Sequence, residues 1–407
     1  MGGIDGLRAV AALWVVLFHM RAATGAVLWP GVDLVVRSGS TGVSLFLVLS
    51  GLCLYLPYAG GRSDRFRGSE FFRKRVRRLL PTYYVSLAIV LAAYIVSNGR
   101  LGFPSLSSSE VAAQSITHVT MTHQLFPETF YGLNGGYWSL GLEWELYLTL
   151  PLLIILAVRF GLGRTVAGVF AVTAVYRLGL FAAVQAGLLD PHGMWATVVL
   201  PNQFLGRWSE FALGMVAAEL FRTRRVRVGW PLALTAVTCA LVALSFPDNP
   251  LNHMLYGILF FTLVSLVLAG DNPVAKVFSW RPLVAIGVMS YSLYLVHQPL
   301  LVVLSHLAGL DPTADPGFAF MILLLLSPVI LLAALALFAG VERHSMVPPG
   351  APSVPARHLL FPPLTKPAAT APTDSAPAEA EPAGARRTRL INTWPLMSPT
   401  AATEERR

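Results

Sequence analysis

The sequence has 407 residues, of which 55% are hydrophobic and only 13% are charged, and its mean hydropathy is +0.62. This composition excludes an ordinary soluble domain and makes the lipid bilayer the expected solvent. The formal net charge of +9 does not indicate nucleic-acid binding, because the arginines gather at the ends of apolar runs, where they are typical of membrane topology.

Apolar runs recur along the chain. A membrane-spanning helix needs roughly 20 mostly apolar residues, because the hydrocarbon layer is about 30 Å thick. Such runs lie near 5–22, 41–58, 81–98, 137–158, 165–187, 202–221, 229–246, 253–269, 283–306 and 316–341. We therefore expect an all-α, polytopic transmembrane bundle of about ten spans.

The basic residues between these runs predict how the chain is oriented. If the runs cross the membrane in alternation, the loops between them fall on two sides. Loops on one side hold only Arg37 and Arg100. Loops on the opposite side hold Arg62, Arg65, Arg67, Arg73, Lys74, Arg75, Arg77, Arg78, Arg159, Arg164, Arg222, Arg224, Arg225, Arg227, Lys276 and Arg281. Because Lys and Arg are enriched in cytoplasmic loops, both termini are predicted to be cytoplasmic, in a multi-pass protein of the inner or plasma membrane.

The first apolar run contains two ionisable residues, Arg8 and His19. At about 100° and 1.5 Å per residue, eleven steps place them on one helix face, roughly 16 Å apart along the axis. Arg8 suits a membrane anchor and His19 an interfacial position near a helix end. Ionisable groups within spans are also costly enough to indicate function, so both interpretations stay open at this point.

The segment 99–136 is the longest connection between two runs. Its half-polar stretch Ser107–His123 predicts an interfacial helix rather than a span. His118 and His123 lie in this connection without a local set of metal ligands, and we expect both to be solvated. The sequence predicts no metal site.

The composition changes beyond Glu342, where Pro and Ala become frequent. Such a segment cannot bury enough apolar surface to fold. We therefore divide the chain into a transmembrane domain, 1–344, and a disordered cytoplasmic tail, 345–407.

Polar residues recur at helical spacing in three later runs. Arg75 and Arg78 are three residues apart, on one face at the mouth of the third run, where they suit either a phosphate-bearing ligand or a membrane anchor. Trp138 suits a substrate contact or an interfacial aromatic residue. Tyr294 and His297 share one stripe, which fits a polar cavity wall or a hydrogen-bonded packing seam equally well.

Five motifs together resemble those of the acyltransferase family 3 membrane enzymes. They cover about 4–342 and follow the order of the family. The motifs are Arg8-x10-His19, Gly42–Gly51, Phe72-x-x-Arg75-x-x-Arg78-x-x-Pro81, Trp138-Ser139-Leu140-x-x-Glu143 and Ser290-Tyr291-Ser292-Leu293-Tyr294-Leu295-Val296-His297.

The resemblance implies roles for these residues. His19 would be the general base, since neutral imidazole suits removal of a hydroxyl proton near neutral pH. Asp33 is the one acidic residue between Asp5 and Asp64, so it is our candidate carboxylate partner of His19, with a solvated loop aspartate as the alternative. Glu143 is the further catalytic candidate, whereas Glu145, nearly opposite it around the helix, suits a structural role.

The same resemblance implies the ligands. Arg8, Arg75 and Arg78 would bind the acyl-CoA donor, with acetyl-CoA as one candidate, because arginine suits phosphate groups. Trp138, Tyr294 and His297 would contact the acceptor. No permanently bound cofactor is expected. The remaining partners would be membrane lipids and a hydroxyl-bearing sugar or metabolite.

The leading hypothesis is a membrane-embedded O-acyltransferase. It would move an acyl group from acyl-CoA to a hydroxyl of a carbohydrate, an envelope glycan or lipid, or a secondary metabolite. A transporter or exporter that uses the same His and Glu residues as a proton or substrate relay is the main alternative. A non-catalytic membrane sensor or scaffold is a third.

Overall fold

The computed structural model describes residues 2–97, 100–311, 313–347 and 355–360, and these residues form helices and connections without strands. The α-helices are α1 (Gly2–Thr24), α2 (Pro30–Arg37), α3 (Gly42–Tyr55), α4 (Gly68–Ser97), α5 (Ser108–Val119), α6 (Pro127–Phe130), α7 (Trp138–Phe160), α8 (Leu162–Gln185), α9 (Phe204–Arg222), α10 (Trp230–Ser245), α11 (Asn252–Ala269), α12 (Pro273–Phe278), α13 (Arg281–Val288), α14 (Ser290–Leu307), α15 (Pro316–Leu337), α16 (Arg343–Met346) and α17 (Ala356–Leu360). Short 3₁₀ or π-helical turns are η1 (Ser38–Thr41), η2 (Ser63–Arg65), η3 (His123–Leu125), η4 (Trp195–Val199), η5 (Leu200–Asn202) and η6 (Phe338–Glu342).

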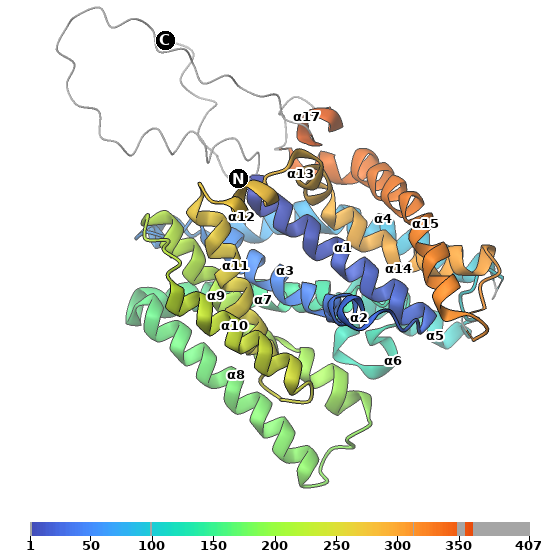
Figure 1. The fold of residues 1–407 in the computed structure, drawn as a ribbon, viewed down its shortest axis with the longest axis horizontal. Coiled ribbons are helices and arrows are strands. Elements are labelled where there is room, and N and C mark those ends of the chain that lie inside the picture. The colour runs from blue at the N-terminus through green and yellow to red at the C-terminus, as the bar shows by residue number, and fades with distance from the viewer. Residues whose placement is uncertain (1, 98–99, 312, 348–354, 361–407) are drawn as a thin grey trace, which may run out of the picture.

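The helices form the bundle expected of a multi-pass membrane protein (Figure 1). Each predicted apolar run is mainly helical, with 283–306 divided between α13 and α14, so the all-α membrane bundle is confirmed. Among the described residues, seven segments are long and apolar enough to cross a membrane, or eight if α13 and α14, which meet at a 72° bend, count as one. The expected ten spans are not confirmed, because α9 carries Arg207, Glu210 and Glu219 and α10 has only 16 residues.

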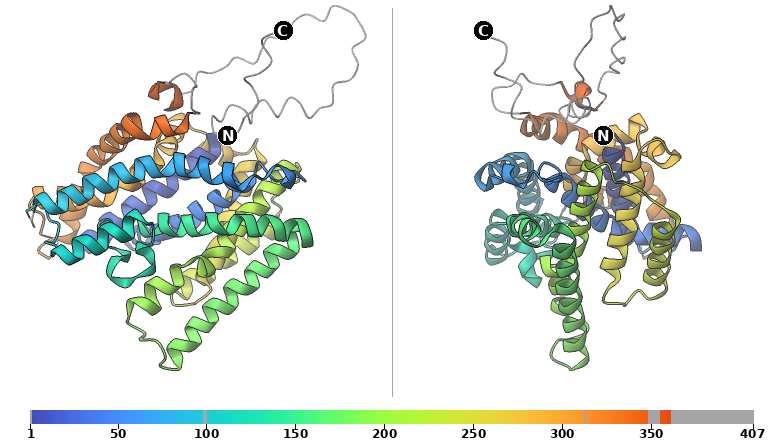
Figure 2. Two further views of the ribbon diagram at one scale, coloured as in Figure 1. Left: turned by 180° about the vertical axis from the view of Figure 1, so that it is seen from behind. Right: turned by 90° about the vertical axis from the view of Figure 1, so that its left-hand side faces the viewer.

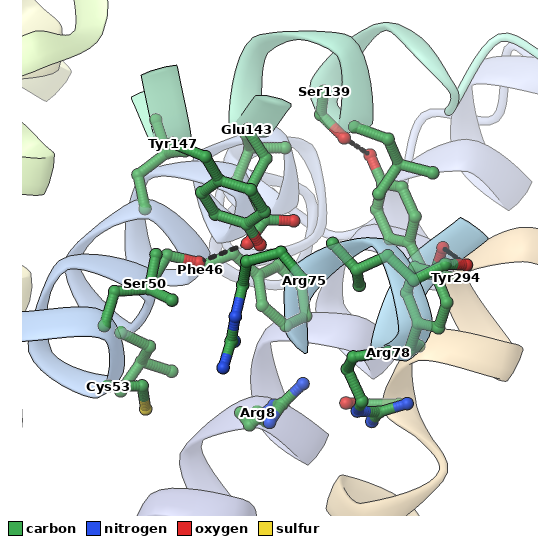
Figure 3. Close-up of a pocket in the computed structure, with 18 residues that line it drawn as sticks. Arg8, Phe46, Ser50, Cys53, Arg75, Arg78, Ser139, Glu143, Tyr147 and Tyr294 are labelled. Atoms are coloured by element: carbon green, nitrogen blue, oxygen red, sulfur yellow. Dashed lines mark hydrogen bonds between the residues drawn. The ribbon is translucent and has the colours of Figure 1, made fainter. Parts of the chain in front are cut away.

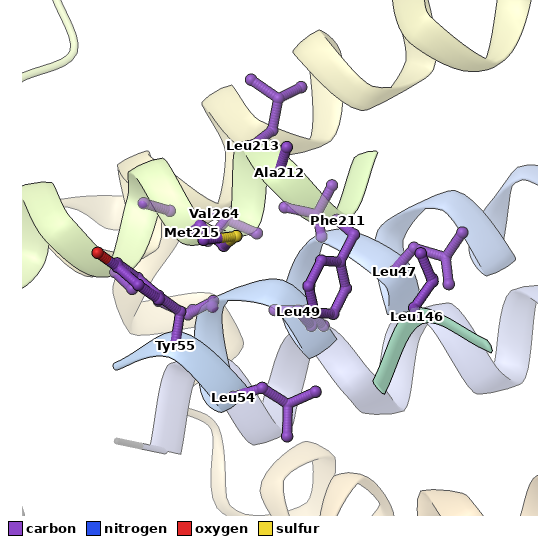
Figure 4. Packing of buried hydrophobic residues seen from close by; sticks show 14 of the residues in the cluster. Leu47, Leu49, Leu54, Tyr55, Leu146, Phe211, Ala212, Leu213, Met215 and Val264 are labelled. Carbon is purple, nitrogen blue, oxygen red and sulfur yellow. The ribbon is translucent and has the colours of Figure 1, made fainter. Parts of the chain in front are cut away.

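The centre of the bundle is an apolar core in which α3 packs along α9, and α11 packs against both of them (Figure 4). Gly51 and Gly214 allow this close packing, since a side chain on Gly51 would collide with the backbone of Phe211, and one on Gly214 with the backbone of Val48. Burial of the surrounding Leu, Phe and Val side chains therefore holds α3 rigidly.

The loops rich in basic residues lie at one end of the bundle, together with the N-terminus, α12, α13 and α17 (Figures 1 and 2). The backbone N–H of Gly60 donates to Glu219 at 2.8 Å and joins the loop after α3 to the end of α9. Arg77 Nη2 donates to the Val347 carbonyl at 2.7 Å and joins the start of α4 to the end of α16. This clustering is what the charge asymmetry requires, and the cytoplasmic orientation of that end stays a prediction.

Part of the predicted tail is ordered. Residues 355–360 include α17, in which the buried Leu360 packs with Met346 and Ala285. Residues 348–354 and 361–407 lie outside the described part of the chain, so the prediction of a disordered tail is untested for them.

Candidate active site

A pocket lies between α1, α3, α4, α7 and α14, at the level of the motif residues (Figure 3). These helices come from distant parts of the sequence, and each contributes a polar side chain to the pocket wall. The charged and phenolic residues lining it are Arg8, Arg75, Arg78, Glu143, Tyr147, Tyr291 and Tyr294. Ser50 and Cys53 of α3 complete one side of it.

Two arginines of α4 that line this pocket, Arg75 and Arg78, have buried N–H groups without a hydrogen-bond partner among the described residues. Arg75 is half-buried over the ring of Phe71, with 5.8 Å from its guanidinium carbon to the ring centroid. Its Nε is buried and has no hydrogen-bond partner among the described residues. Arg78 is 6% exposed, and its Nη1 likewise lacks a partner in the described part of the chain. Because buried polar groups are nearly always hydrogen-bonded, these donors indicate a place for an anionic ligand.

Glu143 supplies the negative charge of the pocket. Ser50 Oγ donates to its carboxylate at 2.6 Å, and the Tyr147 hydroxyl lies beside it (Figure 3). Glu145 has a different environment, as expected from its place on the helix: its carboxylate accepts from Gln124 at 3.1 Å and from the backbone N–H of Phe204 at 2.9 Å. Glu145 therefore fixes the start of α9, and Glu143 alone of the two lines the pocket.

Residues of the Trp138-Ser139 motif divide between the pocket and the packing around it. Ser139 lines the pocket, with its hydroxyl 2.5 Å from that of Tyr294. Trp138 is not among the lining residues; its ring stacks on Phe130, with centroids 5.4 Å apart. Tyr294 lines the pocket, and substrate contacts by Trp138 and Tyr294 both stay predictions.

A pair of histidines adjoins the pocket. His19 of α1 and His297 of α14 face each other, with 3.1 Å between His19 Nδ1 and His297 Nε2. His297 is fully buried and His19 half-buried. Tyr294 joins the two regions, because its side chain lines the pocket while its carbonyl oxygen accepts a hydrogen bond from His297 Nδ1 at 2.7 Å.

This hydrogen-bond chain determines the proton positions in the neutral pair. A carbonyl oxygen only accepts, so the hydrogen of His297 is on Nδ1 and its Nε2 holds a lone pair. That lone pair accepts from Nδ1–H of His19. Nε2 of His19 is therefore left with a lone pair that is able to take a proton.

Asp33 lies in α2, where its carboxylate is bound by another residue. It accepts from Arg21 Nε at 2.7 Å and Nη2 at 3.1 Å, and from the backbone N–H of Leu28 at 3.2 Å. In the described residues the ring of His19 bonds to His297 rather than to Asp33. A catalytic role for Asp33 stays a prediction.

Comparison with known families agrees with this geometry. Residues 1–339 match the model of a family described as "acyltransferase domain". The chain belongs to this acyltransferase family. No solved structure matches it.

Curated relatives share this membrane domain at low identity. The chain is 23% identical over 314 residues to O-acetyltransferase OatA of Staphylococcus aureus, covering 74% of this chain and 50% of that protein. It is 24% identical over 323 residues to peptidoglycan O-acetyltransferase OatA of Listeria monocytogenes, covering 73% of this chain and 49% of that one. The chain thus spans about half the length of the relatives that it matches.

Sequence reasoning missed two buried carboxylates. Glu342 is fully buried and pairs with Arg78 at 2.7 Å. Glu210 is also fully buried and pairs with Arg207 of the same helix at 2.7 Å. Their signal in the sequence was an acidic residue inside or directly after an apolar run.

The expectation that His118 and His123 are solvated is wrong. Both are fully buried, and their rings stack with centroids 4.2 Å apart at an interplanar angle of 9°. Burial lowers the pKa of His118 to about 3 and that of His123 to about 4, because a charged ring would lose its hydration. Among the described residues no group of three His, Cys, Asp or Glu side chains could hold a metal ion.

Proposed function

We propose that the protein is a membrane O-acyltransferase that moves an acyl group, with acetyl as the first candidate, from acyl-CoA to a hydroxyl of a cell-envelope carbohydrate. The observation that carries this proposal is a pocket lined by arginines with unpartnered N–H groups, whose wall residue Tyr294 accepts a hydrogen bond from His297 of the histidine pair. The names of the curated relatives, one an O-acetyltransferase and one a peptidoglycan O-acetyltransferase, support acetyl transfer to a glycan.

In the proposed reaction the donor enters from the basic end of the bundle. Arg8, Arg75 and Arg78 bind its phosphate groups, because arginine N–H groups form charge-assisted hydrogen bonds with phosphate oxygens. The thioester then lies further along the pocket, toward Tyr294. This arrangement brings the acyl carbon toward the histidine pair.

His19 acts as the general base. Its Nε2 lone pair takes the proton of the acceptor hydroxyl while the hydroxyl oxygen attacks the thioester carbonyl carbon. The new C–O bond forms and the C–S bond breaks, and the imidazolium returns the proton to the coenzyme A thiolate. His297 accepts from His19 Nδ1–H throughout and so keeps the ring in this orientation.

The proposal is tested with the full chain purified into lipid nanodiscs. Acetyl-CoA labelled in the acetyl group is supplied together with fragments of envelope glycans, and the label is followed by mass spectrometry. We expect a base-labile ester on a glycan hydroxyl and a matching acetyl mass difference between envelopes from cells with and without the gene. Failure to bind coenzyme A, together with unchanged envelopes, would exclude this function.

A further inference from the structure

Glu342 is a fully buried carboxylate at the end of η6 whose two oxygens contact different elements. Oε1 accepts from Arg78 Nη2 of α4 at 2.7 Å. Oε2 accepts from the backbone N–H of Ser292 at 3.1 Å and from its hydroxyl at 2.5 Å. One side chain thus joins three segments that are far apart in the sequence.

The contact with Ser292 lies in the first turn of α14. N–H groups in a first turn have no partner within their own helix, and a carboxylate there also interacts favourably with the helix dipole. The chain bends by 72° between α13 and α14, so the direction of α14 is set at this turn. The same helix carries Tyr294 in the pocket wall and His297 in the histidine pair.

The contact with Arg78 restrains a guanidinium in the pocket wall. Nη2 is bound by Glu342, and the guanidinium carbon lies 5.9 Å from the centroid of the Tyr291 ring. Nη1, which has no partner in the described residues, is then the group left for a ligand. Without the carboxylate, the buried cation would turn toward another acceptor, and Glu143 lines the same pocket.

We propose that Glu342 is a positioning residue of the donor site, which holds Arg78 so that Nη1 faces the phosphates of coenzyme A and fixes the first turn of α14. This inference rests on the proposed function for the identity of the anionic ligand. Glu342 acts through Arg78 and does not itself contact the donor. The loss of its charge therefore weakens donor binding only while Arg78 is present.

The test is a double-mutant cycle on the dissociation constant of coenzyme A, measured with the full chain in nanodiscs. Glu342→Gln keeps an acceptor for Ser292 but removes the charge, and we expect it to weaken binding by about tenfold or more. In an Arg78→Gln background the same change should alter binding by less than about twofold. Glu342→Asp, which keeps the charge, should restore part of the affinity. Glu70→Gln is the matched control, because Glu70 is an exposed carboxylate that pairs with Lys74 on the same helix as Arg78.

Equal weakening in both backgrounds would show that Glu342 acts through general folding and would overturn the proposal. Unchanged or tighter binding by Glu342→Gln would also overturn it, because the carboxylate would then merely neutralise Arg78. If the unmutated chain binds no coenzyme A, the proposed donor is wrong and the donor part of this inference falls with it. Thermal unfolding of the same four proteins distinguishes a wrong donor from a wrong role for Glu342. If Glu342 and Arg78 interact, their substitutions should destabilise the protein non-additively even when coenzyme A does not bind.

Discussion

Two sets of arginine and glutamate side chains are buried in the helix bundle, and they differ in how completely they are hydrogen-bonded. In α9, Arg207 donates to both carboxylate oxygens of Glu210, at 2.7 and 2.9 Å, to Asn202 at 2.9 Å and to Ser44 at 3.0 Å. In the pocket, by contrast, buried N–H groups of Arg75 and Arg78 have no partner in the described part of the protein.

This difference separates packing from ligand binding. The Arg207–Glu210 pair joins α9 to α3 through Ser44. Because its hydrogen bonds are made within the protein, it offers no free donor to a ligand. A buried cation with unsatisfied donors beside a pocket is in a costly state that an anion relieves. The presence of a charge in an apolar helix thus indicates function only when its donors remain free.

The largest effect is expected when the fully hydrogen-bonded pair Arg207–Glu210 is broken. Glu210→Ala leaves the Arg207 cation buried and unpaired, and we expect it to lower the free energy of unfolding by about 3–5 kcal/mol. Chemical or thermal unfolding in detergent measures this loss. Replacing both residues by leucine should recover much of it, and a merely additive loss in the double variant would argue against an energetic pair.

The next largest effect should be a loss of catalysis that leaves folding unchanged. His19→Gln keeps a polar side chain that cannot take the proton, so acyl transfer should fall by about 100-fold while coenzyme A binding persists. His19→Ala should behave in the same way. Turnover and coenzyme A binding are compared at matched amounts of folded protein. Near-normal turnover by either variant would demote His19 to a structural residue and make Glu143 or His297 the next candidate base.

A smaller effect is expected when the pocket arginines Arg75 and Arg78 are substituted. Arg75→Ala should weaken coenzyme A binding by about tenfold with little loss of stability, because its Nε has no described partner to leave unpaired. Arg78→Ala should weaken coenzyme A binding as well, but it should also destabilise the protein, because it leaves the buried carboxylate of Glu342 without its ion-pair partner. Arg73 is exposed on another face of α4, and Arg73→Ala is the matched control. Equal coenzyme A affinities for all three variants would favour simple membrane anchoring.

The last prediction concerns the buried histidine pair outside the pocket, His118 and His123. Because the pKa values of His118 and His123 are lowered to about 3 and 4 in the folded state, the unfolded chain binds more protons between about pH 6.5 and pH 3. Stability should therefore be unaffected above about pH 6.5 and should fall progressively below it. Thermal unfolding at pH 7.5 and pH 5 measures this change. A His118→Phe, His123→Phe double variant should reduce the pH dependence, and an unchanged slope would assign the acid sensitivity to other groups.

The sequence predicted much of the pocket, because its helices carry polar residues inside long apolar stretches. Arg8, Arg75, Arg78, Glu143 and Tyr294 were all singled out, and all line one pocket. Such residues can be found by sequence alone, since their cost in lipid is a local property of each helix.

Partnerships between helices could not be found in this way. His19 and His297 are 278 positions apart, and nothing in either helix specifies the other as a partner. Arg78 and Glu342 are 264 positions apart, and the one partner that we proposed for His19, Asp33, was chosen because it is close in sequence. The sequence by itself determined which helices form and which polar residues they carry. The tertiary structure decided which of those residues meet, because the packing of α1 and α4 against α14 sets their distances, and those contacts depend on the whole bundle.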